Sequence, residues 1–254
     1  MEKAASFYFY GSLNDFLPAS YKSKLVPYTF TGAPAVKDAI EALGVPHPEV
    51  QGILVNDYPV DFKYQLQQAD WVEVYPASAG ATWPAHYSIQ APLPTTPTFI
   101  LDVHLGKLAK SLRLLGFDTL YQNDFTDSTI AQLASEQHRV VLTRDIGLLK
   151  HKSIQWGYWL RSQHLEEQLT EVLSYFRLAS KFSTFSRCLV CNSLILPVPK
   201  AAVLAQLPAK TKLYFDEFYQ CPTCQRVYWK GSHYERMQEF VQRLKAGEAG
   251  SVGD

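Results

Sequence analysis

Apolar runs and helical patterns alternate along residues 99–180. The short apolar runs predict buried strands, because the strands of a parallel sheet are covered on both faces. They lie at 99–103, 117–121, 139–143 and 156–161. The segments between them carry apolar residues at helical spacing, at 105–115, 127–137 and 164–178, and the first of these stops at Gly116, a natural helix end. Strands that alternate with helices build an α/β domain with a parallel sheet.

The first 76 residues have a different pattern. An aromatic strand runs into a loop over 6–18, and further strands are predicted at 24–30, 52–57 and 71–76. A helix is predicted at 34–46, which closes with Gly44 and Pro46. Two opening strands, one helix and two closing strands form a separate α+β domain. The following segment, 77–98, is rich in proline and has little periodicity, so we expect a semi-rigid linker there.

Three aspartates lie where a predicted strand gives way to a helix. Asp102 is close to the end of the first strand, Asp127 opens the second helix, and Asp145 follows the third strand. Ligands of parallel α/β sheets bind beyond the carboxyl ends of the strands, where these side chains are expected. Gathered carboxylates favour Mg²⁺ or Mn²⁺, which can activate a water and neutralise a phosphoryl group. The pattern therefore indicates a metal-dependent phosphodiesterase.

Each aspartate also has a structural interpretation. Asp127 can cap its helix by accepting the N–H groups of the first turn. Asp145 can start the short helix at 146–151 or pair with Arg144. Asp102 is the hardest to explain in this way, because a charge at the end of an apolar strand is costly unless it is paired or bound to a metal. Asp124 is a weaker candidate, either a solvated loop residue or an outer ligand.

Four cysteines form two CxxC pairs, Cys188 with Cys191 and Cys221 with Cys224. Two such pairs provide the four thiolates of a tetrahedral Zn²⁺ site, and no cysteine is left over. Two disulfides are the alternative, but no leader segment is recognised, and disulfides within the pairs would be strained. We therefore expect a structural zinc ion.

Charge changes along the chain although the total is balanced, with 24 basic and 24 acidic side chains. Basic against acidic residues number 5 and 9 over 1–92, 9 and 9 over 99–180, and 10 and 6 over 181–254. The C-terminal part is thus the better candidate for holding nucleic acid. No apolar run is long enough to span a bilayer, so we expect a cytoplasmic protein without membrane contact.

The run FILDVHLGKLAKSLRLLGFDT, then DSTIAQLA and RVVLTRD, resembles the Mut7-C family, ribonucleases with a PIN-like nuclease fold. The segments CLVCN, CPTC and VYWKGSH resemble its C-terminal zinc ribbon, so the similarity covers roughly 99–240. This resemblance implies metal-dependent cleavage of RNA, with Asp102, Asp127 and Asp145 as acidic ligands. The N-terminal domain resembles a ubiquitin-like β-grasp. A sulfur carrier needs a terminal Gly-Gly, which YPASAG does not provide, so we expect a module that binds substrate or a protein partner.

Basic and aromatic residues supply candidates for RNA contact, since phosphate neutralisation dominates RNA affinity. Arg113 lies in the SLRLLG part of the resemblance and can contact phosphate or an active-site carboxylate. Lys107 and Arg144 are further candidates, with solvated faces as the alternative. Trp229 and Lys230 belong to an aromatic and basic segment suited to stacking on single-stranded bases. The equally weighted alternative is that the aromatic residues of this segment serve as packing.

The sequence thus predicts a metal-dependent endoribonuclease with RNA as its partner. Its alternative is a non-catalytic module that binds RNA or protein. A D-x-D phosphatase is disfavoured, because His104 stands where its second aspartate would be. The expected boundaries are 1–76 for the β-grasp, 77–98 for the linker, 99–180 for the PIN-like nuclease, and 181–254 for the zinc ribbon and tail.

Overall fold

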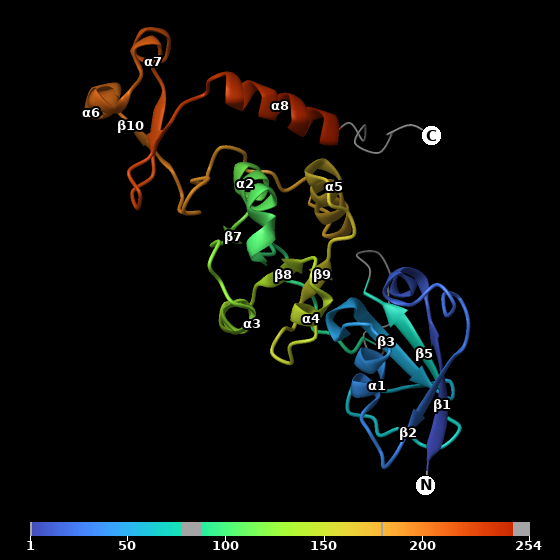
Figure 1. Ribbon diagram of the computed structural model, residues 1–254. Helices are drawn as coiled ribbons and strands as arrows, with labels where there is room; N and C mark the ends of the chain where they lie inside the picture. The colour runs from blue at the N-terminus through green and yellow to red at the C-terminus, as the bar shows by residue number, and fades with distance from the viewer. Residues whose placement is uncertain (1, 78–87, 179, 246–254) are drawn as a thin grey trace. The chain divides into compact units, whose positions relative to one another are not determined.

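The computed structural model describes residues 2–77, 88–178 and 180–245 (Figure 1). By their internal contacts the residues form two compact units. Unit 1 comprises residues 1–96 and 125–160, and unit 2 comprises 97–124 and 161–254. Parts of the predicted linker (78–87) and of the predicted tail (246–254) lie outside the described residues. The two units are described separately below.

Unit 1 begins with a five-stranded sheet in the order β2-β1-β5-β3-β4. Strand β1 pairs antiparallel with β2 and parallel with β5, and β3 pairs antiparallel with β5 and β4. This arrangement, with one helix after the opening hairpin, is the β-grasp that the sequence predicts. The elements are β1 (Lys3–Phe9), η1 (Gly11–Phe16), β2 (Val26–Phe30), α1 (Val36–Ala42), η2 (His47–Glu49), β3 (Val50–Val55), β4 (Tyr58–Pro59) and β5 (Trp71–Pro76).

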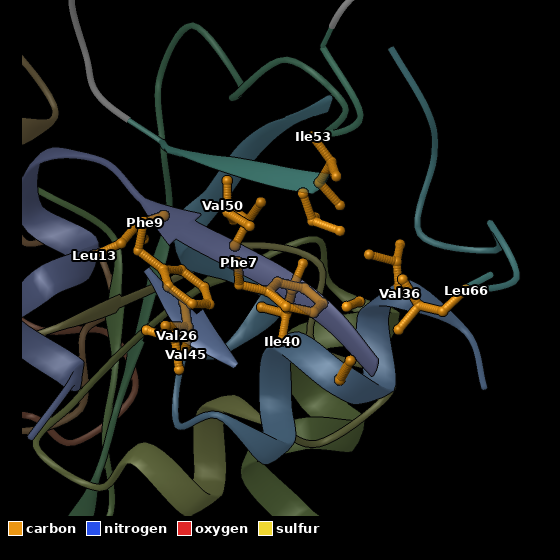
Figure 2. Packing of buried hydrophobic residues seen from close by; sticks show 14 of the residues in the cluster. Phe7, Phe9, Leu13, Val26, Val36, Ile40, Val45, Val50, Ile53 and Leu66 are labelled. Carbon is orange, nitrogen blue, oxygen red and sulfur yellow. The ribbon is translucent and has the colours of Figure 1, made fainter. Parts of the chain in front are cut away.

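The β-grasp core lies between this sheet and helix α1. Phe7 and Phe9 alternate with exposed or half-buried residues along β1, as a half-buried strand requires. Figure 2 shows Phe7 facing Ile40 of α1, with Val26 and Val45 nearby. Burial of these apolar side chains is the main favourable term for this domain.

The second segment of unit 1 packs against the same core. It contains α3 (Asp127–Glu136), β8 (Val140–Thr143), α4 (Ile146–Leu149) and β9 (Gly157–Trp159), with β8 parallel to β9. Ile146 and Trp159 contact the buried β-grasp cluster. The backbone N–H of Trp159 also donates to the Glu49 carboxylate at 2.7 Å, and Lys150 Nζ donates to the Glu41 carbonyl at 2.6 Å. Residues of the predicted nuclease thus fold together with the β-grasp.

Unit 2 holds the other nuclease elements. They are β6 (Phe99–Leu101), η4 (Val103–Leu105), α2 (Gly106–Leu114), β7 (Thr119–Leu120) and α5 (Leu165–Tyr175). Strands β6 and β7 are parallel, which agrees with the predicted α/β class. Phe99 is fully buried, and its ring contacts those of Phe117 and Phe176.

The ribbon part of unit 2 carries a three-stranded antiparallel sheet in the order β10-β11-β12. Its elements are β10 (Leu196–Val198), α6 (Lys200–Val203), η5 (Leu204–Gln206), α7 (Ala209–Tyr214), β11 (Phe218–Gln220), β12 (Val227–Tyr228) and α8 (Ser232–Lys245). The sequence analysis predicted a ribbon here but none of these helices. No described helix has both the length and the apolar character required to cross a membrane.

Candidate functional site

Asp102 immediately follows strand β6, at the carboxyl end of the strand. The three apolar residues of that strand, Phe99 to Leu101, are completely buried. Asp102 follows them directly and is also buried, with an exposed fraction of 7%. Its carboxylate accepts a hydrogen bond from the His104 N–H at 3.3 Å and caps the short helix η4. A buried carboxylate is costly unless polar partners or a cation surround it, which makes Asp102 the strongest of the acidic candidates.

Asp145 and Asp127 are both exposed and both stand at helix starts. Asp145 lies two residues beyond β8 and is the N-cap of α4, where its Oδ1 accepts the Gly147 N–H at 2.7 Å. This is the structural role weighed for it above. Asp127 is the first residue of α3, but the cap is Thr126, whose hydroxyl accepts the Thr129 N–H. The interpretation that Asp127 caps this helix is therefore wrong, because the Thr126 hydroxyl already fills that role.

The three aspartates are divided between the units. Asp102 belongs to unit 2, whereas Asp127 and Asp145 belong to unit 1. A shared cation site formed by all three therefore stays a prediction.

Arg113 has a different environment from the one we predicted. Its exposed fraction is only 3%, and burial lowers the pKa of its guanidinium. The guanidinium donates to the backbone carbonyls of Thr119 (2.9 Å), Leu189 (3.0 Å), Val190 (2.9 Å) and Tyr121 (3.4 Å). These bonds connect helix α2 to the first cysteine pair and favour a structural role over a phosphate contact.

The remaining candidates for RNA contact differ in exposure. Lys107 and Arg144 are exposed. Lys230 is also exposed but pairs with Glu217 at 3.1 Å, which raises the pKa of the lysine. Trp229 is half-buried and packs on the cluster of Val203, Leu207 and Phe218, in agreement with the packing alternative.

The four cysteines lie close together, and their sulfur atoms are all within 4.8 Å of one another. The Sγ atoms of Cys188 and Cys224 are 3.5 Å apart, and those of Cys191 and Cys221 are 3.3 Å apart. All four are free thiols, so the disulfide alternative is wrong. Among the described residues, these cysteines are the one group of three or more His, Cys, Asp or Glu side chains that lie close enough together to hold a metal ion. Its four sulfur donors fit a soft or borderline metal ion.

The surroundings of the cysteines support metal binding. Burial raises the pKa of Cys191, but hydrogen bonds with Ser193 and the neighbouring thiols outweigh it and lower the pKa to about 6. Burial has the opposite result at Cys224, whose pKa it raises to about 12, so Cys191 is the one of these two cysteines that favours the thiolate form that ligates metals. The Tyr228 hydroxyl lies 3.1 Å from Cys188 Sγ and accepts the Leu189 N–H, so this tyrosine supports the cluster.

A polar network that the sequence analysis missed ties this cluster to the turn after α2. Asn192 Oδ1 accepts the Thr119 N–H at 3.0 Å, and its amide donates to Asp118 at 2.9 Å. Arg187 donates to the Gly116 carbonyl at 3.1 Å and pairs with Asp118 at 3.4 Å. These partners are more than 60 residues apart in the chain, and only the CxxCN motif itself offered a signal.

Two models of known protein families match consecutive parts of the chain. Residues 97–241, more than half of the chain, match the model of the Mut7-C RNAse domain. Residues 2–81 match the model of the Mut7-C ubiquitin domain. No curated protein and no solved structure matches the chain. The chain belongs to the Mut7-C RNAse domain family, with a Mut7-C ubiquitin domain ahead of it.

Proposed function

We propose that this protein is a metal-dependent ribonuclease that hydrolyses RNA phosphodiester bonds. The observation that carries the proposal, within a chain of the Mut7-C RNAse family, is the buried carboxylate of Asp102 directly after strand β6. Such a position is where α/β proteins bind their ligands. Asp127 and Asp145 would complete the acidic set.

The donor chemistry fits Mg²⁺ or Mn²⁺, since both prefer carboxylate oxygens and keep several waters. When bound, such an ion supplies an activated water and neutralises charge on the phosphate. The three aspartates would hold the ion. Lys107 and Arg144 are exposed and would neutralise the phosphates of the RNA strand.

The four cysteines are proposed to hold a structural Zn²⁺ ion. A tetrahedron with Zn–S bonds of about 2.3 Å has sulfur–sulfur edges of about 3.8 Å. The Cys191–Cys221 and Cys188–Cys224 sulfur–sulfur distances, 3.3 and 3.5 Å, are close to that value. Because protein ligands fill all four positions, this ion would stabilise the fold and take no part in hydrolysis.

Cleavage of labelled RNA with Mg²⁺ or Mn²⁺ tests the catalytic proposal. Asp102→Asn keeps the side-chain volume but removes the charge, so the cleavage rate should fall about a hundredfold or more. Asp127→Asn should have the same effect. Glu136→Gln is the matched control, because Glu136 is an exposed acid at the other end of the same helix, α3.

The result has three informative outcomes once thermal unfolding shows that the variants are folded. Loss of cleavage in Asp102→Asn and Asp127→Asn but not in Glu136→Gln supports the proposal. Equal cleavage by wild type and Asp102→Asn overturns the catalytic assignment. RNA binding without cleavage by any of the proteins overturns it too, in favour of a non-catalytic binding module.

A further inference from the structure

A pocket of about 540 Å³ opens within unit 1, where the β-grasp contacts the loop that leads into β9. The β-grasp contributes the start of α1 and residues 62–65, and the loop contributes residues 152–155. Residues 89–91 form a further part of the wall. The aspartates and cysteines described above do not line this pocket.

The pocket concentrates positive charge in a domain that is otherwise acidic. Lys37, Lys63 and Lys152 line it, against one acidic residue, Asp38. Residues 1–92 contain five basic and nine acidic side chains, so two of the five basic ones lie at this pocket. An anionic ligand is therefore favoured at this pocket.

The three lysines are available to a ligand. Lys37 is half-buried, and Lys63 and Lys152 are exposed. Within the part of the chain that the structure describes, no protein acceptor is recorded for their ammonium groups. Lys150 close by shows the contrast, since its Nζ donates to the Glu41 carbonyl at 2.6 Å. Ammonium groups without protein acceptors are suited to neutralising phosphates.

The pocket lining also includes apolar and aromatic side chains. Phe62 and Ile89 are half-buried and offer contact area to a base or a ribose, whereas Ile154 is almost completely buried. His47 also lines the pocket and meets the Phe62 ring edge to face, with the ring centroids 6.0 Å apart. The His47 ring contacts two acceptors, the Glu41 carboxylate at 2.6 Å and the Ile154 carbonyl at 2.8 Å, and thereby joins the two walls.

We propose that this pocket binds the phosphate groups of nucleotides, and that single-stranded RNA supplies them. Three ammonium groups around an apolar wall match a chain in which phosphates alternate with flat bases. The inference deepens the proposed function by placing a second RNA contact on the ubiquitin-like domain. The binding itself requires no catalysis.

The test measures binding of a fluorescent RNA hexamer to the full-length protein without added Mg²⁺ or Mn²⁺. The double variant Lys37→Gln/Lys63→Gln should weaken binding about tenfold at low salt. Two lost phosphate contacts should also reduce the slope of log Kd against log salt concentration by about 1.4, since each contact on a single strand contributes about 0.7. Lys152→Gln should act in the same direction.

The matched control is Lys22→Gln/Lys24→Gln, which removes the same charge from exposed lysines of the same domain that lie outside the pocket. An equal loss in both double variants, or no loss in either, overturns the proposal. ADP in place of RNA separates the sources of phosphate, because a hexamer that binds no tighter than ADP identifies free nucleotides as the ligand. A poly-glutamate peptide that binds as tightly as RNA also overturns it.

This test is independent of the catalytic proposal. If the wild-type protein binds RNA through the pocket but never cleaves it, only the nuclease assignment is overturned. If the Lys37→Gln/Lys63→Gln variant cleaves and binds RNA as wild type does, only the pocket proposal is overturned.

Discussion

Gly116 shows how a single residue sets the junction between nuclease and ribbon. It ends α2 with φ at +96°, and the N–H groups of Gly116 and Phe117 bond to the Arg113 and Leu112 carbonyls. This is the Schellman arrangement that favours glycine. A Cβ atom here would lie 2.2 Å from the Ser183 carbonyl oxygen. Both the backbone conformation and the close approach of another segment therefore require glycine.

Gly116→Ala should lower the free energy of unfolding by more than about 2 kcal/mol, since a clash with backbone is added to the conformational cost of about 1 kcal/mol. Gly32→Ala is the control. Its φ is also positive, at +73°, but a Cβ there meets nothing within 4 Å, so only the conformational cost applies. Urea unfolding of both variants measures the difference, and equal losses would show that the clash is relieved at no cost.

Arg113→Met should destabilise the protein by about 3 kcal/mol, because it leaves the buried Thr119 carbonyl and the part-buried carbonyls of Leu189 and Val190 without their donor. Lys110→Met, on an exposed position of the same helix, should change stability by less than about 0.5 kcal/mol. Chemical denaturation checks both values. A variant at Arg113 that is as stable as wild type but binds RNA more weakly would restore the phosphate-contact interpretation.

At the scale of elements, the cysteine cluster and the turn after α2 should lose order together. The Thr119 N–H donates to Asn192, the residue after the first cysteine pair, so ordering of that pair protects a nuclease amide. Cys188→Ser, or chelation of the proposed Zn²⁺ ion, should increase hydrogen exchange at Thr119 about tenfold or more.

Amides of β1 in the β-grasp serve as the internal reference, because unit 1 contains none of the cysteines. Exchange that rises equally at Thr119 and in β1 would indicate global destabilisation. Unchanged exchange at Thr119 would contradict the coupling.

Elements with a strong local pattern could be predicted from the sequence. The leucines of α2 and the apolar runs of β6 and β8 identified those elements, although β6 ends at Leu101 and so stops short of Asp102. Helices α6, α7 and α8 were not predicted; α6 and α7 span only Lys200–Val203 and Ala209–Tyr214, which is too short for a clear helical pattern. The spacing of the cysteines predicted their cluster, whereas the role of Arg113 depends on carbonyls more than 70 residues away, which no local pattern encodes.

At the scale of the whole molecule, the compact units do not coincide with the predicted domain boundaries. Unit 1 combines the β-grasp with residues 125–160 of the nuclease region, since Ile146 and Trp159 pack on the β-grasp core. The two family models, in contrast, match two consecutive segments of the chain, 2–81 and 97–241. Similarity along the sequence and packing in space thus divide this protein differently.

Deletion of residues 1–96 should therefore impair the nuclease region even though its family segment is intact. The deletion exposes Ile146 and Trp159 and removes the acceptors Glu49 and Glu41 from β9 and Lys150. We expect a lower Tm and aggregation in size-exclusion chromatography, with partial recovery when the fragment 1–96 is added separately. A monomeric fragment that unfolds as cooperatively as the full chain would contradict this dependence.

The interrupted course of unit 1 has a consequence for biosynthesis. During translation, residues 1–96 of unit 1 are synthesised first and are followed by residues 97–124, which belong to unit 2. Residues 125–160, which complete unit 1, are synthesised only afterwards. Part of the apolar surface of the nascent β-grasp therefore stays exposed to solvent until roughly 60 further residues have been synthesised. Translation speed across that interval, and chaperones that bind the uncovered surface, are thus expected to govern the yield of folded protein.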